Sequence, residues 1–94
     1  MPATPRLAVV IPVFNEVANV APLVTRLDAA LAGTAWEAIF VDDDSPDGTA
    51  AAARAVAAGD SRVRCIRRIG RRGLASACIE GFLSTSAEFV AVID

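Results

Sequence analysis

Three consecutive aspartates, residues 42–44, stand where an apolar run ends, and Asp94 closes a second apolar run. Adjacent carboxylates repel one another unless cations, amide donors or water compensate, so the cluster needs a physical reason. Strand side chains alternate between faces, and Asp43 is therefore expected to point away from Asp42 and Asp44. Carboxylates at such points can accept N–H groups of a ligand or carry a divalent ion. Both strand ends are candidates for a site.

A second interpretation of residues 42–48 needs no ligand. "DDSPDG" is a turn rich in capping groups, in which Asp44, Ser45 and Asp47 would bond backbone amides. This interpretation suits Asp44 and Asp47 as well as a site does. It suits Asp43 less well, because one cap does not need three acids.

A third candidate segment is "PVFNE", directly after the first apolar run. A dinucleotide-binding loop would show G-x-G-x-x-G here, and the segment has no glycine. Pro12, Phe14 and Glu16 offer a rigid turn, an aromatic face and an acceptor carboxylate, which suit a base and a ribose hydroxyl. Ordinary core filling is an equal alternative for Phe14.

The composition limits the chemistry. The chain has 94 residues, 54% of them hydrophobic, and a formal net charge of -2, which indicates one small folded domain and no nucleic-acid partner. All nine basic residues are arginine, and histidine is absent. Schiff-base chemistry, a Walker lysine and a histidine base are thereby excluded. The missing lysine also argues against a response-regulator receiver, which gathers acids in a similar way.

Cysteine usage and hydropathy bear on the compartment. Cys65 and Cys78 lack CxxC spacing and are expected to be reduced thiols rather than a disulfide. The apolar stretch near the N-terminus is interrupted by Pro12 and makes a poor signal peptide. No run reaches the ~18 to 20 apolar residues of a membrane span. We expect a cytoplasmic segment, with the longer protein held at the cytoplasmic membrane face through parts outside this chain.

Strand and helix patterns alternate along the chain. Apolar residues after Asn19 recur at helical spacing, with Asn19 as cap and Gly33 as exit, and Asp47 or Thr49 can cap the next helix. Arginines alternate with apolar residues in 62–68, which is typical of an edge strand with one face in water. Strands are predicted at 7–13, 36–42, 62–68 and 88–94, and helices at 15–33, 47–60 and 71–86.

This order predicts an α/β domain with a parallel sheet and right-handed crossovers. Ligands of such sheets bind beyond the carboxyl ends of the strands. Residues 12–16, 42–44 and Asp94 all lie at those ends. The acidic cluster is therefore expected where a site should be.

In combination and in order, four motifs carry a resemblance: "VVIPVFNE", "FVDDDSPDGT", "RRGLASACIEGF" and "FVAVID". They resemble the N-terminal, nucleotide-binding half of the family 2 glycosyltransferases of the GT-A fold. The nearest subgroup is that of dolichol-phosphate mannose synthase and its bacterial polyprenyl-phosphate relatives. The resemblance covers residues 7–94. It implies a Rossmann-like sheet of about four strands, ordered 3-2-1-4, with helices on both faces.

The resemblance also implies roles for single residues. Pro12, Phe14 and Glu16 would line the nucleotide, with Glu16 near the ribose. Val41 and Asp43 would flank the base, and Asp43 would accept its N–H groups. Further implied residues are Arg72 and Gly73 close to the nucleotide, Ala77 and Gly81 in close helix packing, and Asp94 as the first aspartate of a metal-binding Asp-x-Asp.

By resemblance, the protein is an inverting glycosyltransferase that moves a hexose, with mannose from GDP-mannose in first place, to a polyprenyl or dolichyl phosphate. Mg²⁺ or Mn²⁺ on the diphosphate is the implied cofactor. Such an acceptor is already ionised, so no strong general base is needed and no catalytic residue is assigned in this chain. Two alternatives stay open: an enzyme that uses a UDP-sugar such as UDP-glucose with another lipid or polysaccharide acceptor, and a nucleotide-binding module without turnover.

Two departures from the family pattern stand out. Glu80 occupies a position where relatives often carry a basic residue, which puts a phosphate contact there in doubt. The chain also stops at Asp94, before a second metal aspartate. Residues 1–94 are therefore expected to be the front part of a catalytic domain, inactive, marginally stable and prone to aggregation alone.

Overall fold

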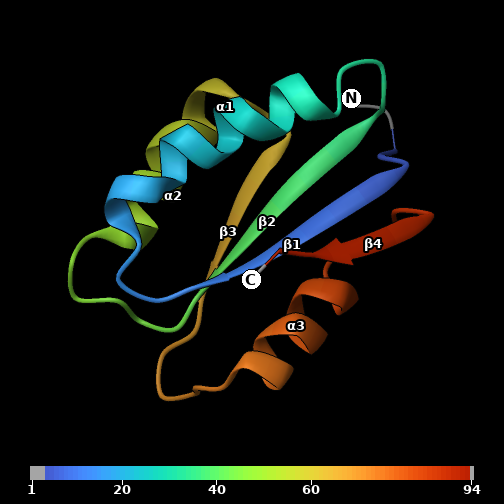
Figure 1. Cartoon of the computed structure of the whole chain (residues 1–94). Coiled ribbons are helices and arrows are strands. Elements are labelled where there is room, and N and C mark those ends of the chain that lie inside the picture. Colours follow the sequence, from blue (N-terminus) through green and yellow to red (C-terminus); the bar gives the residue numbers. More distant parts are fainter. Residues whose placement is uncertain (1–3, 94) are drawn as a thin grey trace.

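The computed structural model describes residues 4–93, and the elements alternate as expected (Figure 1). Residues 17–19 form one turn of 3-10 helix ahead of the first α-helix. The elements are β1 (Leu7–Val13), η1 (Val17–Asn19), α1 (Val20–Ala30), β2 (Trp36–Asp42), α2 (Thr49–Gly59), β3 (Val63–Arg67), α3 (Leu74–Leu83) and β4 (Phe89–Val92).

The strands form one parallel sheet in the order β3-β2-β1-β4, which confirms the predicted order. Val13 at the end of β1 pairs with Asp42 at the end of β2, and Asp42 pairs with Arg67 at the end of β3. The carboxyl ends of these three strands therefore lie side by side. The loops that follow them must meet at this edge.

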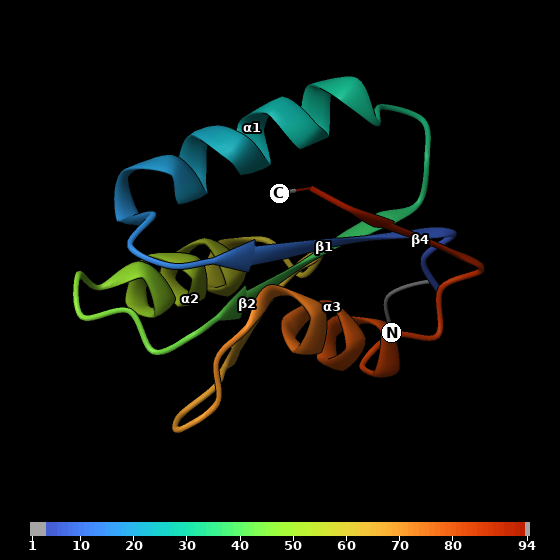
Figure 2. The same cartoon turned by 60° about the horizontal axis from the view of Figure 1, so that its bottom comes forward.

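Helices cover both faces of the sheet, as predicted. α1 and α2 lie together on one face and α3 lies on the other (Figure 1). In the turned view of Figure 2, α1 and α3 stand on opposite sides of β1. Alternation along β1 divides the core accordingly, because Val9 and Ile11 pack with α1 and α2, whereas Ala8 and Val10 pack with Ala77 of α3.

Close packing of α3 on the sheet depends on its small residues. Ala77 is 1% exposed, and Gly81 is buried against β1. A Cβ added at Gly81 would lie 2.4 Å from Cγ1 of Val10. The predicted packing role of Ala77 and Gly81 is confirmed.

Helix ends differ from the sequence expectations. α3 begins at Leu74, later than predicted, because Gly73 adopts φ +127°, outside the helical region. Asn19 precedes α1 but makes no capping bond, and its amide instead donates to Glu16 Oε2 at 2.6 Å. Gly48 is the residue before α2, while Asp47 accepts from the Thr49 N–H at 3.0 Å and so takes the capping role.

β4 is the least covered strand. It pairs with β1 as expected, and its residues are all exposed, with Phe89 52% exposed. Cys65 on β3 and Cys78 on α3 are both free thiols, as predicted. Among residues 4–93, no helix is long and apolar enough to cross a membrane.

Candidate functional site

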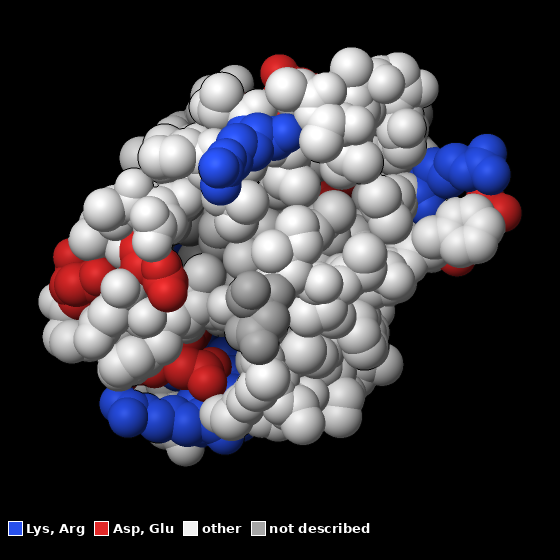
Figure 3. Space-filling view, in the orientation of Figure 1, with Lys and Arg blue, Asp and Glu red and all other residues white. Residues whose placement is uncertain are grey.

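The loops after β1 and β2 meet at the carboxyl edge of the sheet, where the Asp43 N–H donates to the Val13 carbonyl at 3.3 Å. Figure 3 shows acidic and basic side chains gathered at the lower left of the molecule, the end at which β1 and β2 finish in Figure 1. The three aspartates of residues 42–44 point in different directions there, and each has its own partners.

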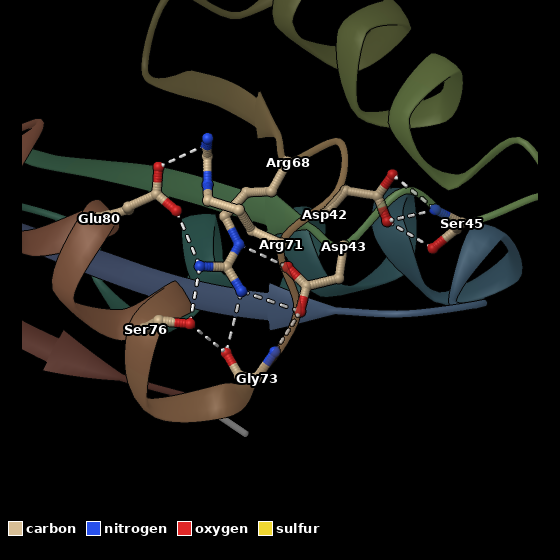
Figure 4. Close-up of polar contacts among 8 residues, drawn as sticks. All are labelled: Asp42, Asp43, Ser45, Arg68, Arg71, Gly73, Ser76 and Glu80. Atoms are coloured by element: carbon tan, nitrogen blue, oxygen red, sulfur yellow. Dashed lines mark hydrogen bonds and ion pairs between the residues drawn. The ribbon is translucent and has the colours of Figure 1, made fainter.

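Asp42 is a structural residue. Its carboxylate is fully buried and accepts from the Ser45 N–H at 3.2 Å and from the Ser45 hydroxyl (Figure 4). The Ser45 oxygen in turn accepts from the Asn15 N–H at 2.9 Å. The turn after β2 is thereby fastened to the turn after β1.

Asp47 fastens the same two turns. Its Oδ2 accepts from the Val17 N–H at 3.2 Å, and its Oδ1 accepts from the Thr49 hydroxyl. The Thr49 oxygen accepts from the Glu16 N–H at 3.0 Å. These bonds, the Thr49 hydroxyl first, lower the pKa of Asp47 below its ordinary value. The turn interpretation is confirmed for Ser45 and Asp47.

Asp44 does not fit that interpretation. Its carboxylate accepts from Arg67 Nε at 2.9 Å and from no backbone amide of residues 4–93. Its backbone has φ +63°, a left-handed conformation that aspartate tolerates better than most residues. The expectation of an amide contact is wrong, because this conformation turns the side chain outward to the end of β3.

Asp43 faces away from Asp42, as alternation requires, and stands at the centre of a different group (Figure 4). Oδ1 accepts from Arg68 Nε at 2.7 Å, and Oδ2 accepts from Arg68 Nη2 at 3.1 Å and from the Gly73 N–H at 3.0 Å. The Arg68 hydrogen bond, more than any other contact, lowers the pKa of Asp43 below its ordinary value. Asp43 is therefore an ionised acceptor, and its side chain is 15% exposed.

Arg68 is the functional candidate that the sequence analysis missed. The arginines of 62–68 were expected to face water, but Arg68 is fully buried. It contacts Asp43, the Gly73 carbonyl, Ser76 and Glu80, the last at 2.8 Å. Strand alternation is the signal that could have found it. Arg68 is two residues after Ile66, which packs on the α3 side, so both point to that face. Arg68 also follows Arg67, which pairs with Asp42, and therefore stands opposite Asp43.

Glu80 is part of this group as well. It accepts from Arg68 and, at 2.9 Å, from Arg71. The Arg68 hydrogen bond lowers the pKa of Glu80 below its ordinary value. An acid at this position therefore compensates a buried guanidinium.

Phe14 and Arg72 meet at the rim of the site. The guanidinium carbon of Arg72 lies 5.0 Å from the centre of the Phe14 ring, a cation–π arrangement. Phe14 is 43% exposed, which rules out core filling. Phe14, Asp43, Arg72 and Gly73 thus come together from three loops.

Other predicted residues lie apart from that group. Pro12 and Glu16 line a hollow of about 230 Å³ between α1 and the sheet, beside Ile93. Val41 is fully buried in the core on the α3 side, so its side chain offers no surface to a ligand. Asp94 lies outside the described residues.

No three acidic or cysteine side chains gather as a cation site within residues 4–93. The predicted metal ligand, Asp94, falls beyond that part of the chain. The arrangement that is present suits recognition of a flat, N–H-bearing group by an aromatic face and a fixed carboxylate.

Comparisons with known proteins agree with this architecture. The family model "Glycosyl transferase family 2" matches residues 8–94. A dolichol-phosphate mannosyltransferase of Pyrococcus furiosus is 40% identical over 89 residues, which cover 95% of this chain and 25% of the relative. The chain therefore spans about a quarter of the length of that protein.

Two solved structures share the fold. One is a mannosyltransferase of Pyrobaculum calidifontis in complex with GDP-Man and Mn²⁺, with a TM-score of 0.73 and 25% identity, matched over 95% of this chain and 27% of that one. The other is glucosyl-3-phosphoglycerate synthase of Mycobacterium tuberculosis in complex with Mn²⁺, UDP and glucosyl-3-phosphoglycerate. Its TM-score is 0.71 at 27% identity, and the match covers 98% of this chain and 34% of that one.

Proposed function

Because the chain belongs to glycosyl transferase family 2, we propose that it forms the nucleotide-binding part of an enzyme that transfers mannose from GDP-mannose to a polyprenyl phosphate. One observation carries the proposal most directly: Asp43 is held ionised by Arg68, and the Asp43 N–H donates to the carbonyl of Val13, the residue before the exposed Phe14. A dolichol-phosphate mannosyltransferase as a relative and a GDP-Man complex as a structural neighbour support this choice of sugar and acceptor.

Roles follow from where the side chains lie. Phe14 and Arg72 would contact the base, and Asp43 would accept hydrogen bonds from the N–H groups of the base. Gly73 would bring its backbone close to the nucleotide. Glu16 would accept a hydrogen bond from a ribose hydroxyl in the hollow that it lines with Pro12. Val41 would support Asp43 by packing in the core beneath it.

The acceptor phosphate of a polyprenyl chain carries its own negative charge at neutral pH, so it can attack the sugar carbon without a base from this chain. A divalent ion, Mg²⁺ or Mn²⁺, supplies charge stabilisation on the departing diphosphate when bound. Residues 4–93 form no site for it, and Asp94 is the proposed ligand. A membrane lipid as acceptor would place the protein at the cytoplasmic face of a membrane.

A UDP-sugar donor is the second candidate, since one structural neighbour holds UDP. Uracil presents one N–H and guanine presents adjacent N–H groups, and either can meet the Asp43 carboxylate. Adenine presents a ring nitrogen acceptor at the corresponding edge and should be rejected by an ionised acid.

Titration calorimetry of the chain with GDP, UDP and ADP tests nucleotide binding. We expect GDP or UDP to bind and ADP to bind at least about tenfold more weakly. Asp43→Asn should weaken binding about tenfold or more, because a charged acceptor is lost. Asp44→Asn is the matched control, since Asp44 carries the same charge but faces Arg67 at the surface.

The same affinity for Asp43→Asn as for the unchanged chain, or no binding of any nucleotide, would contradict the proposal. The donor and acceptor are tested separately, by assaying the protein that carries this chain with GDP-mannose and UDP-glucose in the presence of a polyprenyl phosphate. Inactivity with both sugars would overturn the polyprenyl-phosphate assignment.

A further inference from the structure

Arg68 has an unusual environment for an arginine, because its side chain is fully buried. Each of its N–H groups has a partner. Nε and Nη2 bond the two oxygens of Asp43, Nη2 also bonds the Gly73 carbonyl at 3.1 Å, and Nη1 bonds Ser76 at 2.9 Å and Glu80 at 2.8 Å. Within residues 4–93, no buried side-chain nitrogen or oxygen lacks a partner.

The contacts of Arg68 form a closed ring with the site. Arg68 donates to the Gly73 carbonyl, and the Gly73 N–H donates to Asp43, which itself accepts from Arg68. Gly73 is therefore held through both its N–H and its carbonyl, which belong to the two peptide units that flank its Cα. The residue before it, Arg72, lies over Phe14, so a shift of Gly73 would move the cation–π pair.

Asp43 keeps one open acceptor position in this ring. Among residues 4–93, its Oδ2 receives two donors and its Oδ1 receives one, Arg68 Nε. An ionised carboxylate oxygen accepts about two hydrogen bonds, so Oδ1 can take one more N–H. The fork of Arg68 fixes the plane of the carboxylate and thereby the direction in which this open position points.

We infer that Arg68 is a positioning residue for the nucleotide site, which holds Asp43 and Gly73 in the arrangement that a base requires. This inference rests on the proposed nucleotide binding for its functional meaning, but its structural content stands apart. The remaining partners of Arg68 are Ser76 and Glu80, both on α3. Arg68 therefore links this helix to Asp43, the proposed acceptor for the base.

Loss of an ion pair that serves stability alone should not alter the nucleotide site, whereas loss of a positioning residue should. Arg64 provides the comparison, because it lies on β3, just before Arg68 in the chain, and is also an arginine paired with an acid. It pairs with Glu37 at 2.8 Å and donates to the Ser84 carbonyl near the end of α3. It stands at the far end of the sheet from Asp43. Arg64→Met is therefore the matched control for Arg68→Met.

Arg68→Lys is the variant that guards against loss of the fold, because it keeps the buried cation and loses only the planar fork. The first measurement needs no nucleotide: carboxyl carbon chemical shifts of Asp43 followed by NMR against pH, together with the Gly73 amide resonance. We expect both Arg68 variants to titrate Asp43 at a higher pH than the unchanged chain and to shift the Gly73 amide. Arg64→Met should change neither.

The second measurement is GDP affinity against pH by calorimetry. Arg68→Lys should bind GDP about tenfold more weakly at pH 7. As the pH is lowered, its GDP affinity should begin to fall at a higher pH than that of the unchanged chain, because Asp43 is protonated earlier. Unchanged Asp43 titration and an unchanged Gly73 amide in Arg68→Lys would overturn the inference. Failure of the unchanged chain to bind GDP would instead overturn the proposed function, while the NMR titration would still decide the role of Arg68.

Discussion

Gly81 of α3 lies so close to Val10 of β1 that a methyl group does not fit between them, with 2.4 Å from an added Cβ to Val10 Cγ1. The contact joins the helix that carries Glu80 to the central strand of the sheet. Gly81→Ala should therefore force α3 away from β1 and lower the free energy of unfolding by about 1–3 kcal/mol.

Gly59→Ala is the control for that substitution. Gly59 is the last residue of α2, and no packing neighbour among residues 4–93 lies within 4 Å of an added Cβ there. Its replacement should change stability by less than about 1 kcal/mol, in the stabilising direction. Urea unfolding followed by circular dichroism measures both variants, and equal midpoints would contradict the packing argument.

Acid should unfold the chain through its paired carboxylates. Hydrogen bonds from Arg68 lower the pKa of Asp43 and of Glu80 below their ordinary values, and a hydrogen bond from Arg62 does the same for Asp60. Depressed pKa values mean that this stability is present above the ordinary pKa and is lost as pH falls through the folded-state value.

The urea midpoint should therefore stay level from pH 7 to about 5 and fall below about pH 4. As the pH is lowered, Arg68→Lys should begin to lose stability at a higher pH than the unchanged chain, since the pKa of its Asp43 is lowered less. A midpoint that stays level down to pH 3 would show that these carboxylates gain nothing from their partners.

Thr49 joins two turns through a buried hydroxyl. It accepts from the Glu16 N–H and donates to Asp47. Thr49→Val keeps the shape but leaves both partners without this contact, so we expect a loss of about 1–3 kcal/mol. Thr25→Val removes an exposed hydroxyl bonded to the Ala21 carbonyl and should cost less than about 0.5 kcal/mol. Thermal melts of the two variants should differ clearly.

Phe14 should matter to nucleotide binding through its aromatic face. Phe14→Leu keeps an apolar side chain and removes the ring, and GDP affinity should fall about tenfold. Phe82→Leu is the control, because Phe82 is 41% exposed, close to the 43% of Phe14, but lies near the carboxyl end of α3, whereas Gly73 precedes the start of that helix. Equal GDP affinities for the two variants would remove Phe14 from the proposed site.

β4 should drive self-association of the chain when it is expressed alone. Phe89, Val90 and Val92 are 52%, 41% and 42% exposed on the outer strand of the sheet. Val92→Lys should reduce association measured by light scattering against concentration, because a charge on an edge strand blocks pairing. Ile69→Lys adds the same charge in a loop and should not; equal effects would point to net charge alone.

The parallel sheet and the facing of Asp43 could be predicted, because they follow from short crossover connections and from the alternation of strand side chains. The strand order came from the resemblance to the family. Arg68 could not be predicted from the charge pattern of residues 62–68, since burial depends on α3, which covers that face from a later part of the chain. Asp44 was misjudged for a related reason. Its left-handed backbone directs it to Arg67, and local turn chemistry does not reveal that partner.

Val41 shows the limit of carrying roles over from a resemblance. Val41 stands two residues before Asp43 in the same motif, but a motif does not show which side chains reach the surface, and the structure places Val41 in the core. Cys65 and Cys78, in contrast, were predictable as free thiols, because they lack CxxC spacing.

The fastening of the first two turns has a consequence for anions. Asn15, Glu16 and Val17 donate their backbone N–H groups to Ser45, Thr49 and Asp47 respectively. In nucleotide-binding folds with a glycine-rich first turn, the amides at this helix start receive the phosphates. Here side chains already occupy these amides, so they are not free to receive the diphosphate of the proposed nucleotide. A first turn that does not hold phosphate needs no glycine for close backbone approach, and "PVFNE" has none.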